Sequence, residues 1–295
     1  MAEGPRLESS DSPGSVSVII PLYNGARFIA ETLDSVLSQT VPPSEVIVIN
    51  DGSTDESPEI VRSYGDRVTL ITVPNGGECK ARNIGCNHAS SEWVAFCDSD
   101  DLWLPTKLEK QLRLAGEAPD VECVITDYIE YADGHTMGRN HLSYAPEDFW
   151  AIEPLPTGFV VRQPITGKLT TFQPSISSTP MVRREFYFRI GGFDEEETRW
   201  APDTTFHFRC LSRVPFGVVP EILMHYRRHP ASISADSLKQ LRNSVTVWEH
   251  IIDRYPEAKP YRAELLEGLN AIRKEVAETE RYRRRQKIKR YLGLS

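Results

Sequence analysis

The chain has 295 residues, of which 40% are hydrophobic and 26% are charged, and its formal net charge is −8. This length and composition suit a folded protein with one large domain and exclude a fibrous or low-complexity chain. The acidic balance argues against nucleic acid as a partner, because binding to phosphates requires a basic face.

The cysteines and the apolar runs indicate the compartment. Five cysteines form an odd number without a CxxC pair, which predicts neither a disulfide framework nor a zinc site. No apolar run approaches the roughly 20 residues that span a bilayer. Residues 1–15 are polar, lack the apolar centre of a signal peptide, and are expected to form a disordered tail. We therefore expect a cytoplasmic protein.

Strand and helix signals alternate over the first hundred residues. Short β-branched runs predict four strands, at residues 16–21, 46–49, 68–73 and 93–97. Apolar residues at helical spacing predict three helices, at residues 28–39, 57–64 and 79–89. This rhythm predicts βαβ units, and hence an α/β fold with a mostly parallel sheet whose ligands bind beyond the carboxyl ends of the strands.

The sequence pattern changes twice after the first hundred residues. Residues 123–179 are irregular and rich in Pro, Gly and aromatic side chains, and their path cannot be traced from the pattern. We expect an α/β domain over residues 16–235 and a helical extension over residues 236–295. Two apolar stripes predict amphipathic helices in that extension. The stripes are Leu238, Leu241, Val245, Trp248 and Ile252, then Tyr261, Leu265, Leu269, Ile272 and Val276.

These helices must bury their apolar stripes, either on the α/β domain or in a homodimer. The basic run at residues 281–290 has two interpretations as well. It can make peripheral contact with the inner face of an anionic membrane, or it can be a solvated helix end.

Three carboxylates stand within four residues after the fourth predicted strand, in Asp98-Ser99-Asp100-Asp101. Because like charges so close together repel, the cluster needs a cation or hydrogen-bond donors to balance it. Oxygen ligands at a strand end suit Mg²⁺ or Mn²⁺ bridging a diphosphate. A solvated acidic loop that caps the helix expected near Pro105 is the alternative.

Polar residues also follow the first two predicted strands. Tyr23 can lie against a planar base or pack against the protein, and Asp51 can accept a hydrogen bond from a base or a ribose hydroxyl. Gly52 allows close approach of the backbone. For Asp55 we expect a structural role, as a cap of the following helix.

Seven segments occur in an order that resembles the family 2 glycosyltransferases of the GT-A fold. They are VSVIIPLYNGARFIAETLDSVLSQT, EVIVINDGSTDES, NGGECKARNIG, EWVAFCDSDDLWLPTKLEKQ, IGGFDEE, APDTTFHFR and YRRHPASIS. The resemblance covers about residues 16–235. It implies a metal-dependent, inverting enzyme that moves a sugar from a nucleotide sugar, such as a UDP-sugar, to a hydroxyl of a carbohydrate or glycolipid acceptor. Synthesis of a polysaccharide or another glycoconjugate would be its role.

The resemblance also implies roles for donor-binding residues. Pro21, Tyr23 and Asp51 match positions that hold the nucleotide base, and Arg82 matches an arginine that contacts the donor. In the acidic cluster, Asp98 matches a carboxylate near the ribose. Asp100 matches the ligand of the metal, which would be Mn²⁺ or Mg²⁺.

The general base implied by the resemblance falls on Asp203. The sequence departs from the family just before it, with Pro202 where Glu is usual, and Asp194 is the next candidate. A single base opposite the leaving diphosphate would give direct displacement and inversion. Trp200 can stack on an acceptor sugar or pack in the core.

A histidine- and arginine-containing segment follows the last predicted strand. In the family such a segment can close over the donor diphosphate, and surface salt bridges are the alternative. The residues concerned are His225, Arg227 and His229.

Other functions are compatible with an α/β fold that binds a nucleotide. A nucleotide-sugar-binding module without catalysis would arise if Pro202 displaced Asp203. A nucleotidyltransferase usually has a Gly-rich phosphate loop near its first strand, which PLYNGARF does not resemble. No GxGxxG motif follows the first strand, which argues against a dehydrogenase.

Overall fold

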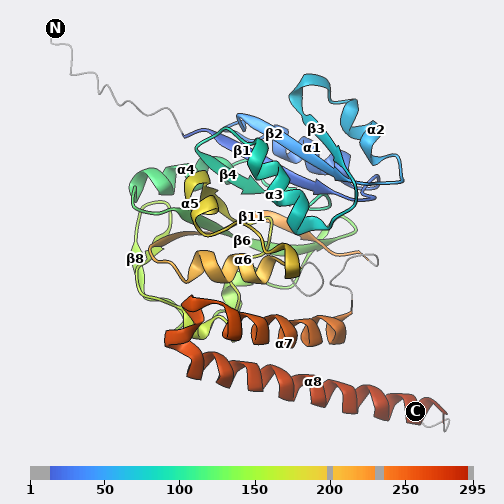
Figure 1. The fold of residues 1–295 in the computed structure, drawn as a ribbon, viewed down its shortest axis with the longest axis vertical. Helices are drawn as coiled ribbons and strands as arrows, with labels where there is room; N and C mark the ends of the chain where they lie inside the picture. The colour runs from blue at the N-terminus through green and yellow to red at the C-terminus, as the bar shows by residue number, and fades with distance from the viewer. Residues whose placement is uncertain (1–13, 198–201, 230–235, 292–295) are drawn as a thin grey trace, which may run out of the picture.

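The computed structural model describes residues 14–197, 202–229 and 236–291. One mixed sheet runs through the molecule, with helices on both faces (Figure 1). Its first half is parallel and consists of β3 (Thr69–Val73), β2 (Glu45–Asp51), β1 (Val16–Leu22) and β4 (Trp93–Phe96), in that spatial order. The four strands that the sequence predicts are confirmed.

The crossover helices also form where the sequence predicts them. They are α1 (Ile29–Leu37), α2 (Ser57–Arg62) and α3 (Glu78–His88), followed by α4 (Lys107–Glu117). Because side chains of a strand alternate between the two faces of a sheet, β1 and β2 contribute to two separate cores. Val18 and Val48 face the core that contains α1, α2 and α4, whereas Ile19 and Ile49 face the core that contains α3.

The second half of the sheet contains the region that the sequence pattern left untraced. β10 (Met181–Arg183) lies antiparallel between β4 and β6 (Cys123–Ala132). β11 (Phe216–Arg227) then runs parallel to β6, and β9 (Phe159–Val161) and β8 (Ile152–Pro154) close that edge. Two short strands join from the side: β5 (Leu102–Trp103) pairs with β11, and β7 (His135–Met137) pairs with β6.

Two further helices and several single turns pack around this half. The helices are α5 (Arg184–Arg189) and α6 (Pro202–Leu211). The 3₁₀ turns of this half are η2 (His141–Tyr144), η3 (Thr166–Lys168) and η4 (Glu195–Glu197), whereas η1 (Gly65–Arg67) connects α2 to β3 in the first half. All five cysteines are buried and unpaired.

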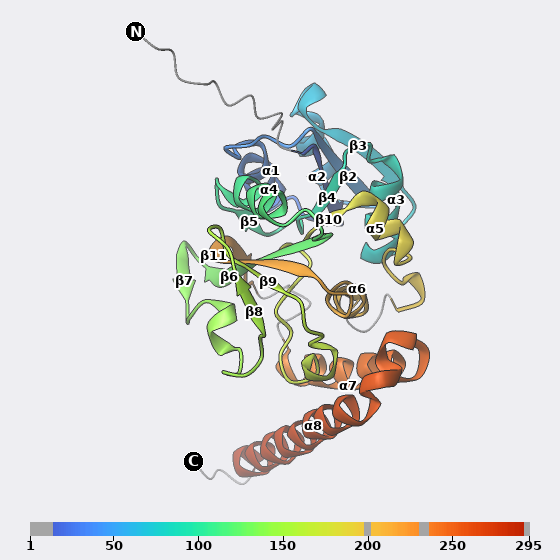
Figure 2. The ribbon, with the colours of Figure 1, turned by 90° about the vertical axis from the view of Figure 1, so that its left-hand side faces the viewer.

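The C-terminal extension forms two antiparallel helices, α7 (Ser237–Arg254) and α8 (Arg262–Tyr291), joined by the 3₁₀ helix η6 (Pro256–Tyr261) (Figure 2). Trp248 is buried edge-on against Phe208 of α6, with ring centroids 5.9 Å apart. The prediction that these helices pack on the α/β domain is therefore confirmed, and a homodimer stays a prediction.

The apolar stripes of the extension are buried only in part. On α7, Leu238, Trp248 and Ile252 are buried as predicted, while Leu241 and Val245 are half-buried. Val247 and Ile251 join the buried set because the helix packs on two sides, against α6 and against α8. Among the described residues, no helix is both long enough and apolar enough to span a membrane.

Candidate active site

The site begins at the carboxyl end of β1. Pro21 is buried inside this strand, where it pairs in register with Ile49 of β2. Tyr23 comes directly after the strand, and 55% of its surface is exposed. An exposed aromatic ring at the ligand edge of a parallel sheet is available for stacking against a planar group.

Asp51, at the end of β2, is buried and hydrogen-bonded to the loop that precedes α3. Its two carboxylate oxygens accept from the amides of Gly76 at 2.7 Å and Gly77 at 2.9 Å. Gly52 has φ +73°, and a Cβ there would stand 2.9 Å from the amide nitrogen of Asn75. The carboxylate therefore fixes the shape of this loop, and its contact with a base or ribose stays a prediction.

Asp55 has the structural role that the sequence predicts. Its Oδ1 accepts from the amide of Ser57, the first residue of α2, at 3.1 Å, and its Oδ2 accepts from the amide of Ala26 at 2.9 Å. These hydrogen bonds lower the pKa of the Asp55 carboxyl and tie the start of α2 to the loop after β1.

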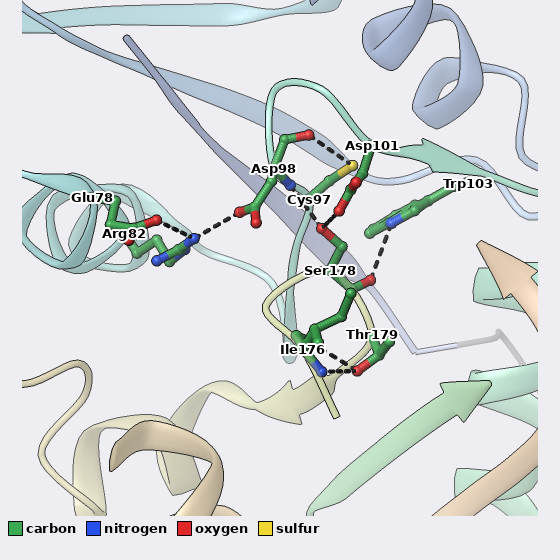
Figure 3. Close-up of polar contacts among 9 residues, drawn as sticks. All are labelled: Glu78, Arg82, Cys97, Asp98, Asp101, Trp103, Ile176, Ser178 and Thr179. Atoms are coloured by element: carbon green, nitrogen blue, oxygen red, sulfur yellow. Dashed lines mark hydrogen bonds and ion pairs between the residues drawn. The ribbon is translucent and has the colours of Figure 1, made fainter. Parts of the chain in front are cut away.

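Arg82 lies on α3 and points toward the acidic cluster (Figure 3). Its side chain is fully buried, and its Nη2 donates to Asp98 Oδ1 at 2.6 Å and to Glu78 Oε2 at 3.0 Å. Within the described ranges, Nε and Nη1 of Arg82 have no hydrogen-bond partner. Buried donors without partners cost free energy, so the guanidinium has capacity for the oxygens of a ligand.

The carboxylate of Asp101 is hydrogen-bonded to groups of the protein itself. It is fully buried, and it accepts from Ser178 Oγ at 2.5 Å and from the amide of Arg227 at 3.0 Å. The same hydroxyl accepts from the amide of Asp98 at 2.9 Å, which fixes the start of the loop (Figure 3). Burial, with the charge of Asp100 beside it, raises the pKa of Asp101 well above its usual range. Asp101 and Ser178 thus shape the loop.

Asp100 has a different partner from a distant part of the chain. Its Oδ2 lies 3.0 Å from Nε2 of His229. Arg227 fixes the backbone of the same loop. Its Nε donates to the carbonyl of Asp100 at 2.7 Å, and its Nη2 pairs with Glu31 at 2.7 Å. The structure therefore brings together Asp100, Arg227 and His229. Contact of this segment with a donor diphosphate stays a prediction.

The expectation that His225 and Arg227 follow the last strand is wrong. Both lie inside β11, which runs to Arg227 because its backbone pairs with β6 as far as Tyr131. The ring of His225 stacks on Tyr131, with centroids 5.0 Å apart and planes 13° apart. Packing thus occupies the His225 ring, whose pKa is lowered by burial.

A pair of side chains at the acidic cluster is suited to binding a divalent cation. Asp100 and His229 present an oxygen and a nitrogen 3.0 Å apart. Over residues 14–197, 202–229 and 236–291, no group of three or more His, Cys, Asp or Glu side chains is arranged to hold a metal ion. Such a pair fits an ion that takes its other ligands from a diphosphate and from water.

Asp203 lies in the first turn of α6 and is partly buried. Its carboxyl interacts electrostatically with Arg82 and Asp98. Burial raises the pKa of Asp203, and Asp98 adds to this, whereas the guanidinium of Arg82 opposes it. Pro202 is the first residue of α6. Proline is favoured there, because the first amide of a helix has no partner within the helix. Trp200 lies outside the described residues.

Sequence reasoning passed over His207, one helical turn after Asp203 on α6. It is buried beside Thr204 and Ser175, and burial lowers its pKa to about 3. The ring therefore stays neutral at ordinary pH. Glu78 was also missed, although its spacing of four residues from Arg82 on a helix is typical of an ion pair.

The sequence is similar to those of known glycosyltransferases. The family model described as Glycosyl transferase family 2 matches residues 17–179. An uncharacterized glycosyltransferase of Rickettsia typhi is 30% identical over 81% of this chain and 72% of its own length. The putative glycosyltransferase EpsH of Bacillus subtilis is 32% identical over 78% of this chain and 65% of its own length.

Solved structures show the same fold. The crystal structure of Staphylococcus aureus TarS 1-349 in complex with UDP-GlcNAc has a TM-score of 0.63 and 22% identity, and the match covers 87% of this chain and 72% of that one. The mannosyltransferase PcManGT from Pyrobaculum calidifontis, in complex with GDP-Man and Mn²⁺, has a TM-score of 0.59 and 22% identity over 90% of this chain and 75% of that one.

These matches confirm the GT-A fold, a mostly parallel sheet flanked by helices with a C-terminal helix. They favour a glycosyltransferase over the nucleotidyltransferase and over the non-catalytic binding module. The family model spans more than half of the chain, and the relatives match most of it. The chain belongs to glycosyl transferase family 2 and is a glycosyltransferase.

Proposed function

We propose that the enzyme transfers a sugar from a nucleoside-diphosphate sugar to a hydroxyl of a carbohydrate or glycolipid acceptor, with inversion and with Mn²⁺ or Mg²⁺. The observation that carries the proposal is the 3.0 Å contact of Asp100 with His229 beside the ion pair of Asp98 with Arg82. The complexes of TarS with UDP-GlcNAc and of PcManGT with GDP-Man and Mn²⁺ support this donor class. We favour a UDP-sugar, a polysaccharide or glycoconjugate product and a cytoplasmic site of action.

The donor would lie across the carboxyl ends of β1, β2 and β4. In this arrangement Tyr23 stacks on the base, Asp51 and Pro21 border it, and Asp98 accepts from the ribose. The unpartnered Nε and Nη1 of Arg82 donate to donor oxygens, which removes the cost of leaving them buried and unpaired.

The leaving diphosphate gains negative charge as the bond to the sugar breaks. A divalent cation held by Asp100 and His229 would neutralise that charge as a Lewis acid. Arg227 holds the backbone of Asp100 in place, so it acts as a positioning residue for this pair.

Asp203 would remove the proton of the acceptor hydroxyl. A carboxylate with a raised pKa is a stronger base than an ordinary aspartate, and burial provides this at Asp203. The acceptor then attacks the anomeric carbon opposite the diphosphate. With one base on the attacking side, the product has inverted configuration.

Calorimetric titration of UDP and GDP, each with Mn²⁺, with Mg²⁺ and with a chelator, tests the donor site. We expect metal-dependent binding by the wild type and its loss in Asp100→Asn and in His229→Ala. Asp66→Asn, an exposed carboxylate in η1, is the matched control and should bind as the wild type does. Unchanged metal-dependent binding in both site variants would refute the proposed metal pair.

The domain boundary at residues 235 and 236 stays part of the proposal. It assigns residues 16–235 to the glycosyltransferase domain and 236–295 to the helical extension. The burial of Trp248 against Phe208 predicts that the extension supports α6 and does not fold as an independent unit.

A further inference from the structure

The end of α8 carries charge that the proposed reaction does not use. From Arg281 onward the chain has seven Lys and Arg residues and no Asp or Glu, although its net charge is −8. The side chains of Arg281, Arg284 and Arg285 are exposed. A cation in the last turn stabilises the helix dipole, but this basic run covers about three turns. The dipole therefore does not account for it.

The end of α8 extends past the start of α7 and lies far from the sheet (Figures 1 and 2). Leu265 and Leu269, in the first turns of α8, are fully buried, but no described side chain from residue 270 to residue 286 is. Screening by salt limits the repulsion from the acidic body to about 10 Å. A projecting helix end can thus act as a local basic surface on an acidic protein.

Two ion pairs join this helix end to α7. Arg242 of α7 pairs with Glu280 at 2.6 Å, and Arg283 pairs with Asp236, the N-cap of α7, at 3.0 Å. Both pairs are exposed and contribute little to stability. Together they place the basic run beside the start of α7.

The start of α7 connects the basic run to the candidate active site. Asp236 follows His229 by seven residues, and seven residues span at most about 25 Å. His229 contacts Asp100, so the basic run begins within about 30 Å of the proposed metal pair. In Figure 1 the end of β11 and the end of α8 both lie on the right-hand side of the molecule.

The side chains among the basic residues favour a bilayer over a nucleic acid. Tyr282 is 62% exposed within the run, and the sequence continues with Tyr291, Leu292 and Leu294. Aromatic and leucine side chains among Lys and Arg are typical of segments that lie at a membrane interface. Phosphate contacts alone would need no such side chains.

We propose that the basic run of α8, from Arg281 to Tyr291, docks on an anionic lipid bilayer and brings the active site to an acceptor anchored in that bilayer. The second half of this inference rests on the proposed function and names the acceptor class as a glycolipid. The first half depends only on charge and placement. Docking by one helix end would be peripheral and reversible.

Sedimentation of the full chain with vesicles tests the docking. We expect binding to vesicles of equal parts phosphatidylcholine and phosphatidylglycerol, weak binding to phosphatidylcholine alone, and release at high salt. A variant with Arg281→Glu, Arg284→Glu and Arg285→Glu spares Arg283 and its contact with Asp236. Its affinity for the anionic vesicles should fall by about tenfold or more.

The matched control reverses three exposed arginines elsewhere. Arg62, Arg67 and Arg113 lie on or beside α2 and α4, and their change to Glu alters the net charge equally. This control should lose much less affinity than the α8 variant. Equal losses in the two variants, or equal binding to neutral and anionic vesicles, would overturn the proposal.

Three further measurements separate the alternatives. Light scattering that shows a dimer dissociated by the α8 changes would assign the run to self-association and overturn membrane docking. Tighter binding to an RNA duplex than to anionic vesicles would overturn it as well. Calorimetry with UDP and Mn²⁺ on the same variants reports the donor site separately. Loss of vesicle binding with unchanged nucleotide binding supports the docking, and absence of nucleotide binding in the wild type counts only against the proposed function.

Discussion

The two halves of the candidate site are held together over very different distances along the chain. In the donor half, Asp51 is bound by Gly76 and Gly77, and Arg82 by Asp98, within about two βαβ steps. In the catalytic half, the partner of Asp100 is 129 residues away. That half is built from β11, which pairs with β6, and from α6, which packs against α7.

This difference suggests that substitutions in the two halves affect different measured quantities. The donor half is a scaffold of local units, so changes there should affect affinity. The catalytic half depends on long-range packing, so changes there should affect turnover or the stability of the fold. The variants below separate the two.

The largest effect is expected at Asp203. Asp203→Asn keeps the size of the side chain but removes the proton acceptor, so kcat should fall by roughly 10²–10⁴-fold while donor affinity stays unchanged. Steady-state kinetics and nucleotide titration measure the two quantities, and NMR of the first-formed product should show inversion.

Asp194→Asn is the matched control for the base. Asp194 accepts from the hydroxyl of Tyr255 at 2.6 Å, and its hydrogen bonds lower its pKa. A carboxylate bound in this way is a weak base, so we expect turnover near normal. If Asp194→Asn is the inactive variant and Asp203→Asn is not, the base is Asp194.

Next in size is the support of α6 by α7. Trp248→Ala removes a buried ring that packs on Phe208, and the free energy of unfolding should fall by about 3–5 kcal/mol. Tyr282→Ala, an exposed ring on α8, is the control and should change it by less than about 0.5 kcal/mol. Denaturant unfolding compares them. Equal small losses would mean that the extension does not support the domain.

A change in the donor half should be smaller and should act on binding. Asp51→Ala removes the acceptor for Gly76 and Gly77 and any contact with the nucleoside, so nucleotide affinity should weaken by about 1.5–3 kcal/mol. Asp51→Asn retains one acceptor oxygen, so its nucleotide affinity should fall by less than that of Asp51→Ala. Calorimetry with UDP separates them, and wild-type affinity in Asp51→Ala would reduce Asp51 to a turn residue.

Lys107 is the first residue of α4, four residues after the end of β5. Its ammonium is buried 4.0 Å from the Trp103 ring centroid and donates to Gln111 at 2.9 Å, and burial lowers its pKa to about 7. In the unfolded chain its pKa is about 10.4, so between pH 7 and pH 10 the unfolded state binds more protons. Wild-type stability should therefore rise with pH across this window.

Lys107→Met removes that dependence. After the lost contacts with Trp103 and Gln111 are counted, we expect the variant to be more stable at pH 7 by on the order of 2 kcal/mol, with the difference shrinking toward pH 10. Lys110→Met, which removes a surface pair with Glu221, is the control. A difference independent of pH would contradict the lowered pKa.

The smallest effect expected is on the pH profile of the wild type. Asp203 must be ionised to act as a base, and burial raises its pKa. The acid limb of kcat/KM should therefore have its midpoint above the usual aspartate value of about 3.9 and fall about tenfold per pH unit below that midpoint. An acid limb at or below the usual value would assign the titration to another group.

The parallel half of the sheet and the place of the acidic cluster could both be predicted from the sequence. In βαβ units, short apolar runs and helical spacing report burial directly, and the loops after the strands meet at one edge. β6 and β10 could not be found in this way, because their pairing with distant strands, and not a local turn, fixes where they begin and end.

The partner of each carboxylate in the cluster, in contrast, is visible only in the folded structure. In the sequence, Asp98, Asp100 and Asp101 are equivalent acids in one loop. In the fold, the first meets the Arg82 guanidinium, the third is buried against Ser178, and Asp100 faces His229 from beyond the end of β11. Their partners come from elements up to 129 residues away. The free energy of ionisation of each carboxylate depends on those partners, and no local sequence pattern encodes them.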